Sequence, residues 1–422
     1  MKKLRKYISW LTVSIMVIGS VAGCGSSSGQ ADSAAAPEAV AESTAEAASE
    51  AAEPAAEEAA SEAAEPAAEE AASAAEEPAA DAAEAEDHSD WVRMDLTYAS
   101  NLPEAHPSTE QLTRFVEKCN ERMDGLVTIT GYYSSSMLNS AGMYEGIVND
   151  VCDMGFFTTS MCVGLFDCAL LCDKMGFYYE SGKASAAAMY DYYQWCAENT
   201  DEWKDVVPLT VLGLAPQGFA TNHKLETLDD FKGLNCIGAT SFADGLEKWG
   251  MVQNTMEYSD IYEALRNGLM DAYCGTIGVF GNMGVQEILD YAYVCHLLGQ
   301  ANAIVINRDV FERMPESQQK LFMELWKEVQ FEYVGLYLED FTLGNDVMSQ
   351  KYCKEVKHLE SLSPELEAEL LELVKDIPDQ YAAELDAKGQ PGTEALAYYR
   401  SVLDKYNKEY PQSMEGYLRW RE

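Results

Sequence analysis

Residues 258–274 read YSDIYEALRNGLMDAYC, and this stretch predicts the end of a helix followed directly by a strand. We expect the helix over Tyr258–Asn267. Gly268 offers the left-handed conformation that ends many helices, and Met270–Cys274 predicts the strand. A helix that stops at a glycine and leads into a strand is the recurring unit of an α/β architecture.

The stretch TLDDFKGL at 227–234 predicts a second, shorter unit of the same kind. Thr227 is the expected N-cap of a helical turn, and Asp229 and Asp230 are favourable in its first turn, near the positive end of the helix dipole. Gly233 closes the turn before a strand begins.

Outward from these two stretches, strands and helices alternate from Trp91 to about Ile306. Among the expected strands are Val92–Tyr98, Leu126–Thr130 and Asp153–Phe157. This alternation predicts an α/β architecture with mainly parallel strands. After Pro315 the pattern is helical, and we expect one long helix that continues beyond Tyr337.

The first 24 residues have the pattern of an export signal. Four basic residues precede an apolar stretch that is too short for a confident spanning helix. The stretch ends in Val21-Ala22-Gly23-Cys24, which resembles the bacterial lipobox. We therefore expect lipidation of Cys24 and anchoring to the outer face of the bacterial cytoplasmic membrane, since acyl chains bind lipid strongly. The alternatives are an uncleaved membrane anchor or a chance Cys near the cleavage site.

Residues 25–90 predict a tether. They contain 28 Ala, 19 Asp and Glu, four Pro and no Lys or Arg, and residues 51–62 recur almost unchanged as 63–74. Proline interrupts the helix that Ala and Glu favour, and the segment offers almost nothing that could fill a core. We expect a disordered, extended spacer, because its charges repel one another.

The remaining residues, 91–422, carry 25 basic and 52 acidic side chains, a formal charge of −27. Nucleic-acid binding needs a basic face, so this balance argues against it. A body of 332 residues is long enough for two domains with large cores.

Several short motifs occur in a recognisable order between about Asp95 and Tyr406. They are His106-Pro107, Asp153-Met154, Thr221-Asn222, Thr227–Leu234, Tyr262–Asp271, Glu287–Ala292 and Met314–Gln319. In order and spacing the chain resembles the substrate-binding proteins of TRAP (tripartite ATP-independent periplasmic) transporters, of the dicarboxylate-binding-protein type.

The resemblance implies a two-lobed extracytoplasmic solute-binding protein of the Venus-flytrap kind, with a long bracing helix and a helical C-terminus. It implies that a solute is enclosed between the lobes and passed to integral membrane subunits of a TRAP transporter. The chain would cross between lobes near Gly213–Gln217 and Gln300–Val305. The expected divisions are signal peptide 1–24, tether 25–90, first lobe 91–212, second lobe 213–300, and a return to the first lobe over 301–422.

This chain departs from the family pattern where relatives carry an arginine that clamps the carboxylate of an organic acid. That position is Ile237, and no arginine lies between Arg122 and Arg266. Relatives often carry another arginine where this chain has 218–220, Gly-Phe-Ala. We therefore expect a neutral, weakly acidic or cationic solute rather than a simple dicarboxylate. If another cation replaces the clamp, Arg93 and Arg266 are the first candidates.

The expected ligand-binding residues are neutral polar, aromatic or apolar side chains near the family's ligand positions. They are Tyr98, Asn101, Phe157, Gln217, Phe219, Ile237, Thr240, Ser241, Tyr273 and Cys274. Any one of them is more often a core or hinge residue than a ligand contact. Aromatic faces suit rings, sugars or cations.

Other functions have weaker support in the sequence. The five histidines form no H-E-x-x-H motif, and the chain has no G-x-S-x-G elbow, so we expect no enzyme, cofactor or metal. The ten cysteines after Cys24 match no common metal spacing, and several are expected to be buried thiols, Cys119, Cys236 and Cys274 among them.

A binding lipoprotein of an ATP-driven importer is the main alternative function, and a surface adhesin or structural lipoprotein is another. Neighbouring genes for two membrane proteins without an ATPase would favour the TRAP interpretation.

Overall fold

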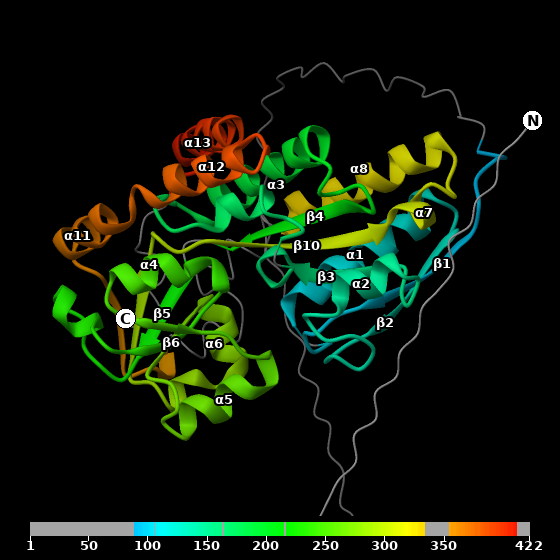
Figure 1. Cartoon of the computed structure of the whole chain (residues 1–422). Coiled ribbons are helices and arrows are strands. Elements are labelled where there is room, and N and C mark those ends of the chain that lie inside the picture. Colours follow the sequence, from blue (N-terminus) through cyan, green and yellow to red (C-terminus); the bar gives the residue numbers. More distant parts are fainter. Residues whose placement is uncertain (1–87, 105, 163, 215–216, 334–353, 412–422) are drawn as a thin grey trace, which may run out of the picture. The chain divides into compact units, whose positions relative to one another are not determined.

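The computed structural model describes residues 88–104, 106–162, 164–214, 217–333 and 354–411. These residues form two β-sheets with helices packed around them (Figure 1). Cys24 and the expected tether up to residue 87 lie outside the described residues. None of the helices in the described part of the chain is long and apolar enough to cross a membrane.

The first sheet has five strands in the order β2-β1-β3-β10-β4. Its strands are β1 (Met94–Ala99), β2 (Val127–Tyr132), β3 (Met154–Thr158), β4 (Val206–Leu214) and β10 (Gln300–Asn307). The helices in the same part of the chain are α1 (Pro107–Arg122), α2 (Met143–Val148), α3 (Gly182–Asn199), α7 (Arg308–Phe311) and α8 (Glu316–Tyr333). Helix α1 packs on α8 through the stacked rings of Phe115 and Trp326, 4.0 Å apart. The expected continuation of α8 beyond Tyr337 lies outside the described residues.

The second sheet has six strands in the order β11-β9-β5-β8-β6-β7. Its strands are β5 (Gln217–Thr221), β6 (Asn235–Ile237), β7 (Val252–Asn254), β8 (Ala272–Gly275), β9 (Tyr291–Cys295) and β11 (His358–Ser361). Helices α4 (Ala243–Lys248), α5 (Tyr258–Arg266) and α6 (Ile277–Met283) connect these strands. Gly268 follows α5 with φ +68°, which confirms the expected left-handed cap.

Among the described residues, five short 3-10 segments complete these two parts. They are η1 (Thr159–Met161), η2 (Ala169–Asp173), η3 (Leu228–Phe231), η4 (Thr240–Phe242) and η5 (Val285–Glu287). Segment η3 is the helical turn expected after Thr227. Its Asp230 carboxylate accepts the backbone N–H of Thr227 at 2.7 Å, so the acidic residue secures the start of the turn.

The chain passes between the sheets from β4 to β5 and back from β9 to β10. The two passages lie beside each other, because Gln300 pairs with Leu214 and Gln217 pairs with Cys295. The second passage lies between Cys295 and Gln300, a few residues before the expected position, since β10 already belongs to the first sheet at Gln300. The expectation of mainly parallel strands is confirmed for most of the described strands. The exceptions are β5 and β10, which run antiparallel to both of their neighbours, so both sheets are mixed.

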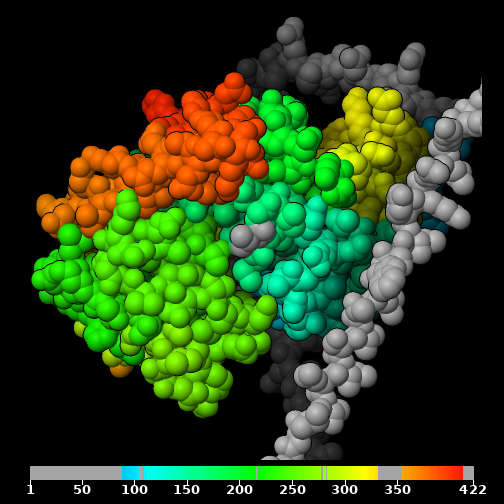
Figure 2. Space-filling model, viewed as in Figure 1, coloured from blue at the N-terminus to red at the C-terminus, as the bar shows by residue number. Residues whose placement is uncertain are grey.

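The C-terminal part of the chain joins both sheets. Strand β11 pairs with β9 in the second sheet, although it lies within the segment 301–422 that was expected to return to the first lobe. The last helices within the described residues are α11 (Pro364–Val374), α12 (Ile377–Ala387) and α13 (Gly392–Glu409). Helix α11 packs on α4, and α13 packs on α3. Figure 2 shows α11–α13, orange to red, running along one side of both lobes.

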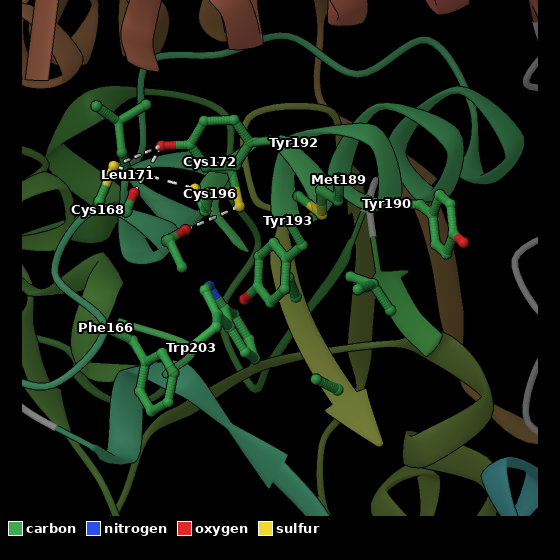
Figure 3. Packing of buried hydrophobic residues seen from close by; sticks show 14 of the residues in the cluster. Phe166, Cys168, Leu171, Cys172, Met189, Tyr190, Tyr192, Tyr193, Cys196 and Trp203 are labelled. Atoms are coloured by element: carbon green, nitrogen blue, oxygen red, sulfur yellow. Dashed lines mark hydrogen bonds between the residues drawn. The ribbon is translucent and has the colours of Figure 1, made fainter. Parts of the chain in front are cut away.

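An aromatic cluster fills the core of the first lobe around α3 and the segments that precede and follow this helix (Figure 3). Phe166 lies 4.7 Å from Trp203, and Tyr193 lies 5.3 Å from the same indole. The cysteines within the described residues are all buried and form no disulfide, which confirms the expectation of buried thiols for Cys119, Cys236 and Cys274. Burial raises the pKa of Cys119 to about 12, so this thiol is protonated and unreactive at neutral pH.

Candidate functional site

Two adjoining cavities of about 140 and 150 Å³ lie between the two sheets. Both are lined by Asn101, Thr158, Tyr258, Tyr273, Cys274 and Gln300. We call the pair the interlobe cavity. Asn101 and Thr158 come from the carboxyl ends of β1 and β3, and Tyr273 and Cys274 lie near the carboxyl end of β8. Ligand sites in open α/β sheets form at this edge, because loops diverge there and leave a crevice.

Neutral polar side chains from the first lobe and the crossing strands form one wall. The Thr158 hydroxyl donates to Asn302 Oδ1 at 2.5 Å, and the two residues are register partners across β3 and β10. Gln217, at the start of β5, is 2 % exposed, and its Oε1 has no hydrogen-bond partner among the described residues. The Ser160 hydroxyl is likewise buried and unpartnered within the part of the chain that the structure describes.

Aromatic side chains form much of the remaining wall of the interlobe cavity. Phe156 and Tyr258 line the compartment that Gln217 borders, and Tyr273 lines both compartments. The Tyr273 ring is fixed by Phe280, whose ring centroid lies 5.1 Å away. Burial raises the pKa of Tyr258 to about 12 and that of Tyr273 further, so both phenols are neutral hydrogen-bond donors.

His106 also lines the cavity, with its ring edge-on to Tyr258 at 6.3 Å between centroids. Burial lowers the pKa of His106 to about 4, because the charged imidazolium would lose its hydration. The imidazole is therefore neutral at physiological pH. Among the described residues, neither compartment is lined by Lys, Arg, Asp or Glu.

The two arginines considered as replacement clamps are engaged elsewhere. Arg93 pairs with Asp95 at 3.1 Å, and Arg266 pairs with Glu263 at 2.7 Å. All four of these side chains are more than half exposed, and none lines the interlobe cavity. Such exposed pairs contribute little energy, but their position leaves the cavity without a cation from either arginine.

The structure brings five of the expected ligand-binding residues together at the cavity. These are Asn101, Gln217, Ile237, Tyr273 and Cys274. Tyr98, Phe157 and Phe219 lie in hydrophobic cores instead. Thr240 and Ser241 belong to η4, where the Thr240 hydroxyl donates to the Ser160 carbonyl at 2.8 Å. This hydrogen bond joins the two lobes beside the cavity.

Strand alternation explains why one phenylalanine lines the cavity and its neighbour does not. Phe156 and Phe157 point to opposite faces of β3, so only Phe156 reaches the cavity. Thr158, Tyr258, Gln300 and Asn302 line the cavity but were not among the residues expected there. Thr158 could have been found from its place at the carboxyl end of a predicted strand, whereas Gln300 and Asn302 depend on β10 crossing into the first sheet.

Comparisons with known proteins agree with this architecture. A model of the family described as "Bacterial extracellular solute-binding protein, family 7" matches residues 98–384. A solute-binding protein of Sulfitobacter sp. (strain NAS-14.1) is 21 % identical over 300 residues, which cover 68 % of this chain and 87 % of the relative.

Solved structures of TRAP solute-binding proteins have the same fold. The Rhodoferax ferrireducens T118 protein, in complex with copurified benzoate, has a TM-score of 0.67 and 17 % identity, covering 75 % of this chain and 99 % of its own. A Desulfovibrio salexigens protein with bound orotic acid has a TM-score of 0.65 and 17 % identity, and the match covers 74 % of this chain and 100 % of that protein's chain. A Bordetella bronchiseptica protein with bound mandelate has a TM-score of 0.64 and 21 % identity, and the match covers 74 % of this chain and 99 % of that protein's chain.

The two-lobed α/β fold expected from the sequence is therefore confirmed. The family is one of solute-binding transport proteins and not a family of enzymes. Because the family model spans more than half of the sequence, the chain belongs to family 7 of the bacterial extracellular solute-binding proteins.

Proposed function

We propose that this protein captures a small organic solute in the interlobe cavity and delivers it to the membrane subunits of a TRAP-type secondary transporter. The observation that carries the proposal is the composition of the cavity wall. Asn101 and Thr158 belong to the first lobe, Tyr258 and Tyr273 to the second, and Gln300 to a crossing strand. A solute held there contacts both lobes at once, so binding favours the closed arrangement.

Polar contacts that can break and re-form join the lobes beside the cavity, which suits repeated opening. The Thr240 hydroxyl donates to the Ser160 carbonyl at 2.8 Å, and the Ser140 hydroxyl donates to the Glu257 carboxylate at 3.1 Å. Water can replace each of these hydrogen bonds when the lobes separate, so the net free energy that they contribute to closure is small. The bound solute would supply the remaining free energy that favours closure.

The lipobox-like sequence before Cys24 supports anchoring of the protein at the outer face of the bacterial cytoplasmic membrane. An anchored protein stays near the membrane subunits that receive the solute. Labelling with a fatty-acid analogue tests the anchor: the wild type is expected to be labelled and Cys24→Ser unlabelled. A labelled Cys24→Ser protein would remove this part of the proposal.

A thermal-shift screen with a library of small metabolites, followed by calorimetry on the best compound, tests solute capture. A ligand at 100 times its Kd stabilises a protein by roughly 2.7 kcal/mol. Val279→Trp fills the cavity from α6 and is expected to abolish the shift. Val252→Trp, at a half-exposed position on the edge strand β7, is the matched control and is expected to keep it. Unchanged binding to Val279→Trp, or no ligand in the whole library, would contradict the proposal.

A further inference from the structure

We propose that the solute is an uncharged molecule of one or two rings whose N–H or O–H group donates a hydrogen bond to Gln217 Oε1. This inference rests on the proposed function and adds the chemical class of the ligand. Three features of the described residues support it: an unpartnered buried acceptor, the charge of the cavity wall, and the size and aromatic character of the cavity.

The acceptor is the side-chain oxygen of Gln217, the first residue of β5. The backbone of Gln217 is fixed at the passage between the lobes, where its N–H donates to the Leu298 carbonyl at 3.2 Å. Its side chain is 2 % exposed and lines the cavity, yet Oε1 has no partner among the described residues. A buried polar atom without a partner destabilises a protein. Because an amide oxygen can only accept, the group that satisfies it must be a donor.

A second unpartnered group lies in the adjoining compartment. The Ser160 hydroxyl is 2 % exposed and lines that compartment, without a hydrogen-bond partner in the described part of the chain. A hydroxyl can donate or accept, so it places fewer demands on the ligand than Gln217 does. The two compartments share Asn101, Thr158 and Gln300, whose amides and hydroxyl suit a ligand with both donors and acceptors.

The charge of the wall disfavours ions of either sign. Among the described lining residues there is no Lys or Arg to pair with a carboxylate and no Asp or Glu to pair with a cation. His106 is neutral at physiological pH, because burial lowers its pKa to about 4. Glu257 directs its carboxylate to the Ser140 hydroxyl at 3.1 Å. An ion that left water for this cavity would therefore lose its hydration without gaining a charged partner.

The size and the aromatic faces set the shape of the ligand. The compartments measure about 140 and 150 Å³, and an apolar cavity of about 150 Å³ can hold a benzene ring. Phe156, Tyr258 and Tyr273 offer ring faces or edges against which a planar ligand can pack. One or two rings with amide or hydroxyl substituents therefore match the cavity.

Two pairs of probes compare an uncharged ligand with a carboxylate: benzamide and benzoate, which have nearly the same shape, and uracil and orotate, of which only orotate carries the carboxylate group. Titration calorimetry on the purified protein is expected to show that the uncharged member of at least one pair binds at least about tenfold more tightly than the carboxylate. Tighter binding of either carboxylate would overturn the inference. So would the failure of both uncharged probes at millimolar concentration.

Gln217→Leu tests the acceptor directly. We expect it to weaken binding of the better uncharged probe by about tenfold or more. Its melting temperature without ligand is expected to equal or exceed that of the wild type, because an unpartnered buried acceptor has been removed. A purely structural role of Gln217 would instead lower that melting temperature and leave binding unchanged. Gln286→Leu is the matched control: Gln286 is buried, its Oε1 is also unpartnered among the described residues, and it does not line the cavity.

The two proposals fail in different ways. If a library compound binds in a manner that Val279→Trp abolishes, but that compound is a carboxylate, the ligand class is wrong and solute capture stands. If nothing in the library binds, both proposals are wrong.

Discussion

His106, a residue of the cavity wall, makes the free energy of unfolding depend on pH. Burial lowers its pKa to about 4 in the folded protein, whereas an unfolded chain has a value near 6.5. Below pH 6.5 the unfolded chain therefore binds a proton that the folded protein does not bind. The free energy of unfolding consequently falls as the pH decreases from about 6.5 towards 4, and above 6.5 this residue contributes no pH dependence.

We predict that His106→Gln removes this part of the acid sensitivity. Between pH 7 and pH 5 the wild type is expected to lose about 2 kcal/mol more unfolding free energy than the variant. Urea unfolding at the two pH values measures the difference, and His223→Gln, at an exposed position, is the control. An equal loss in wild type and His106→Gln would mean that the imidazole is hydrated in the folded state.

Single residues were predictable from the sequence only where position along a strand decides exposure to the cavity. Asn101 follows the end of β1 and lines the cavity, whereas Tyr98, within the strand, is 1 % exposed and packs in the core. Both are polar or aromatic residues near the same family position, so residue type alone could not separate them. The absence of the family's arginine could be predicted from the sequence alone. Residues 123–265 contain no arginine, so no shift of the alignment with the family could place one at the ligand position.

At the scale of elements, η2 and the crossing strand β10 meet through a buried carboxyl group. Asp173 Oδ1 accepts the backbone N–H of Ala301 at 2.7 Å, and Oδ2 has no partner among the described residues. Burial raises the pKa of Asp173 to about 8, although the nearby Lys174 opposes the shift. The carboxyl group is therefore mostly protonated at neutral pH in the folded protein.

We predict that Asp173→Asn stabilises the protein increasingly as the pH rises from 5 to 8. The folded protein keeps the proton up to about pH 8, but an unfolded chain releases it near pH 4. Wild-type stability therefore declines over this interval relative to a side chain that cannot ionise. The amide oxygen can still accept from Ala301.

Thermal unfolding at pH 5 and pH 8 measures this effect. The stability advantage of Asp173→Asn is expected to grow by more than about 1 kcal/mol between the two pH values. Asp201→Asn, at an exposed position, is expected to show no such growth. An advantage that stays constant with pH would indicate that Asp173 is ionised in the folded protein.

The elements themselves followed from the sequence more readily than their directions. The helix at Tyr258–Arg266 and its glycine cap were predicted to within a residue. The antiparallel directions of β5 and β10 were not predicted, because they arise where the chain crosses from one sheet to the other. That geometry depends on contacts between residues far apart in the sequence, such as Gln217 with Cys295, and no local pattern encodes it.

At the scale of the whole molecule, the charge of the chain and the neutrality of the cavity have to be considered together. Residues 91–422 carry a formal charge of −27, and residues 25–90 add 19 acidic side chains without a basic one. A field of this sign slows the approach of an anion and accelerates that of a cation, and both effects weaken with added salt. An uncharged solute is insensitive to the field.

We predict that deleting residues 28–87 leaves solute binding unchanged. The deleted segment contains almost no large apolar side chain, so it offers little that could contribute to the core or the cavity. Its charges act over a screening length of about 8 Å at physiological salt and about 30 Å at 0.01 M. For benzamide, association rate and affinity of the full and the shortened chain are expected to agree at both salt concentrations.

Calorimetry and stopped-flow fluorescence on both chains measure these quantities, with benzoate as the charged comparison. Benzoate is expected to associate more slowly with the full chain at low salt only. A loss of benzamide affinity of about tenfold on deletion, equivalent to about 1.4 kcal/mol, would contradict the tether. Such a loss would mean that part of the acidic segment contacts the solute or the closed lobes. A salt-dependent rate for benzamide itself would mean that the segment changes the opening of the lobes, since an uncharged probe cannot sense its field directly.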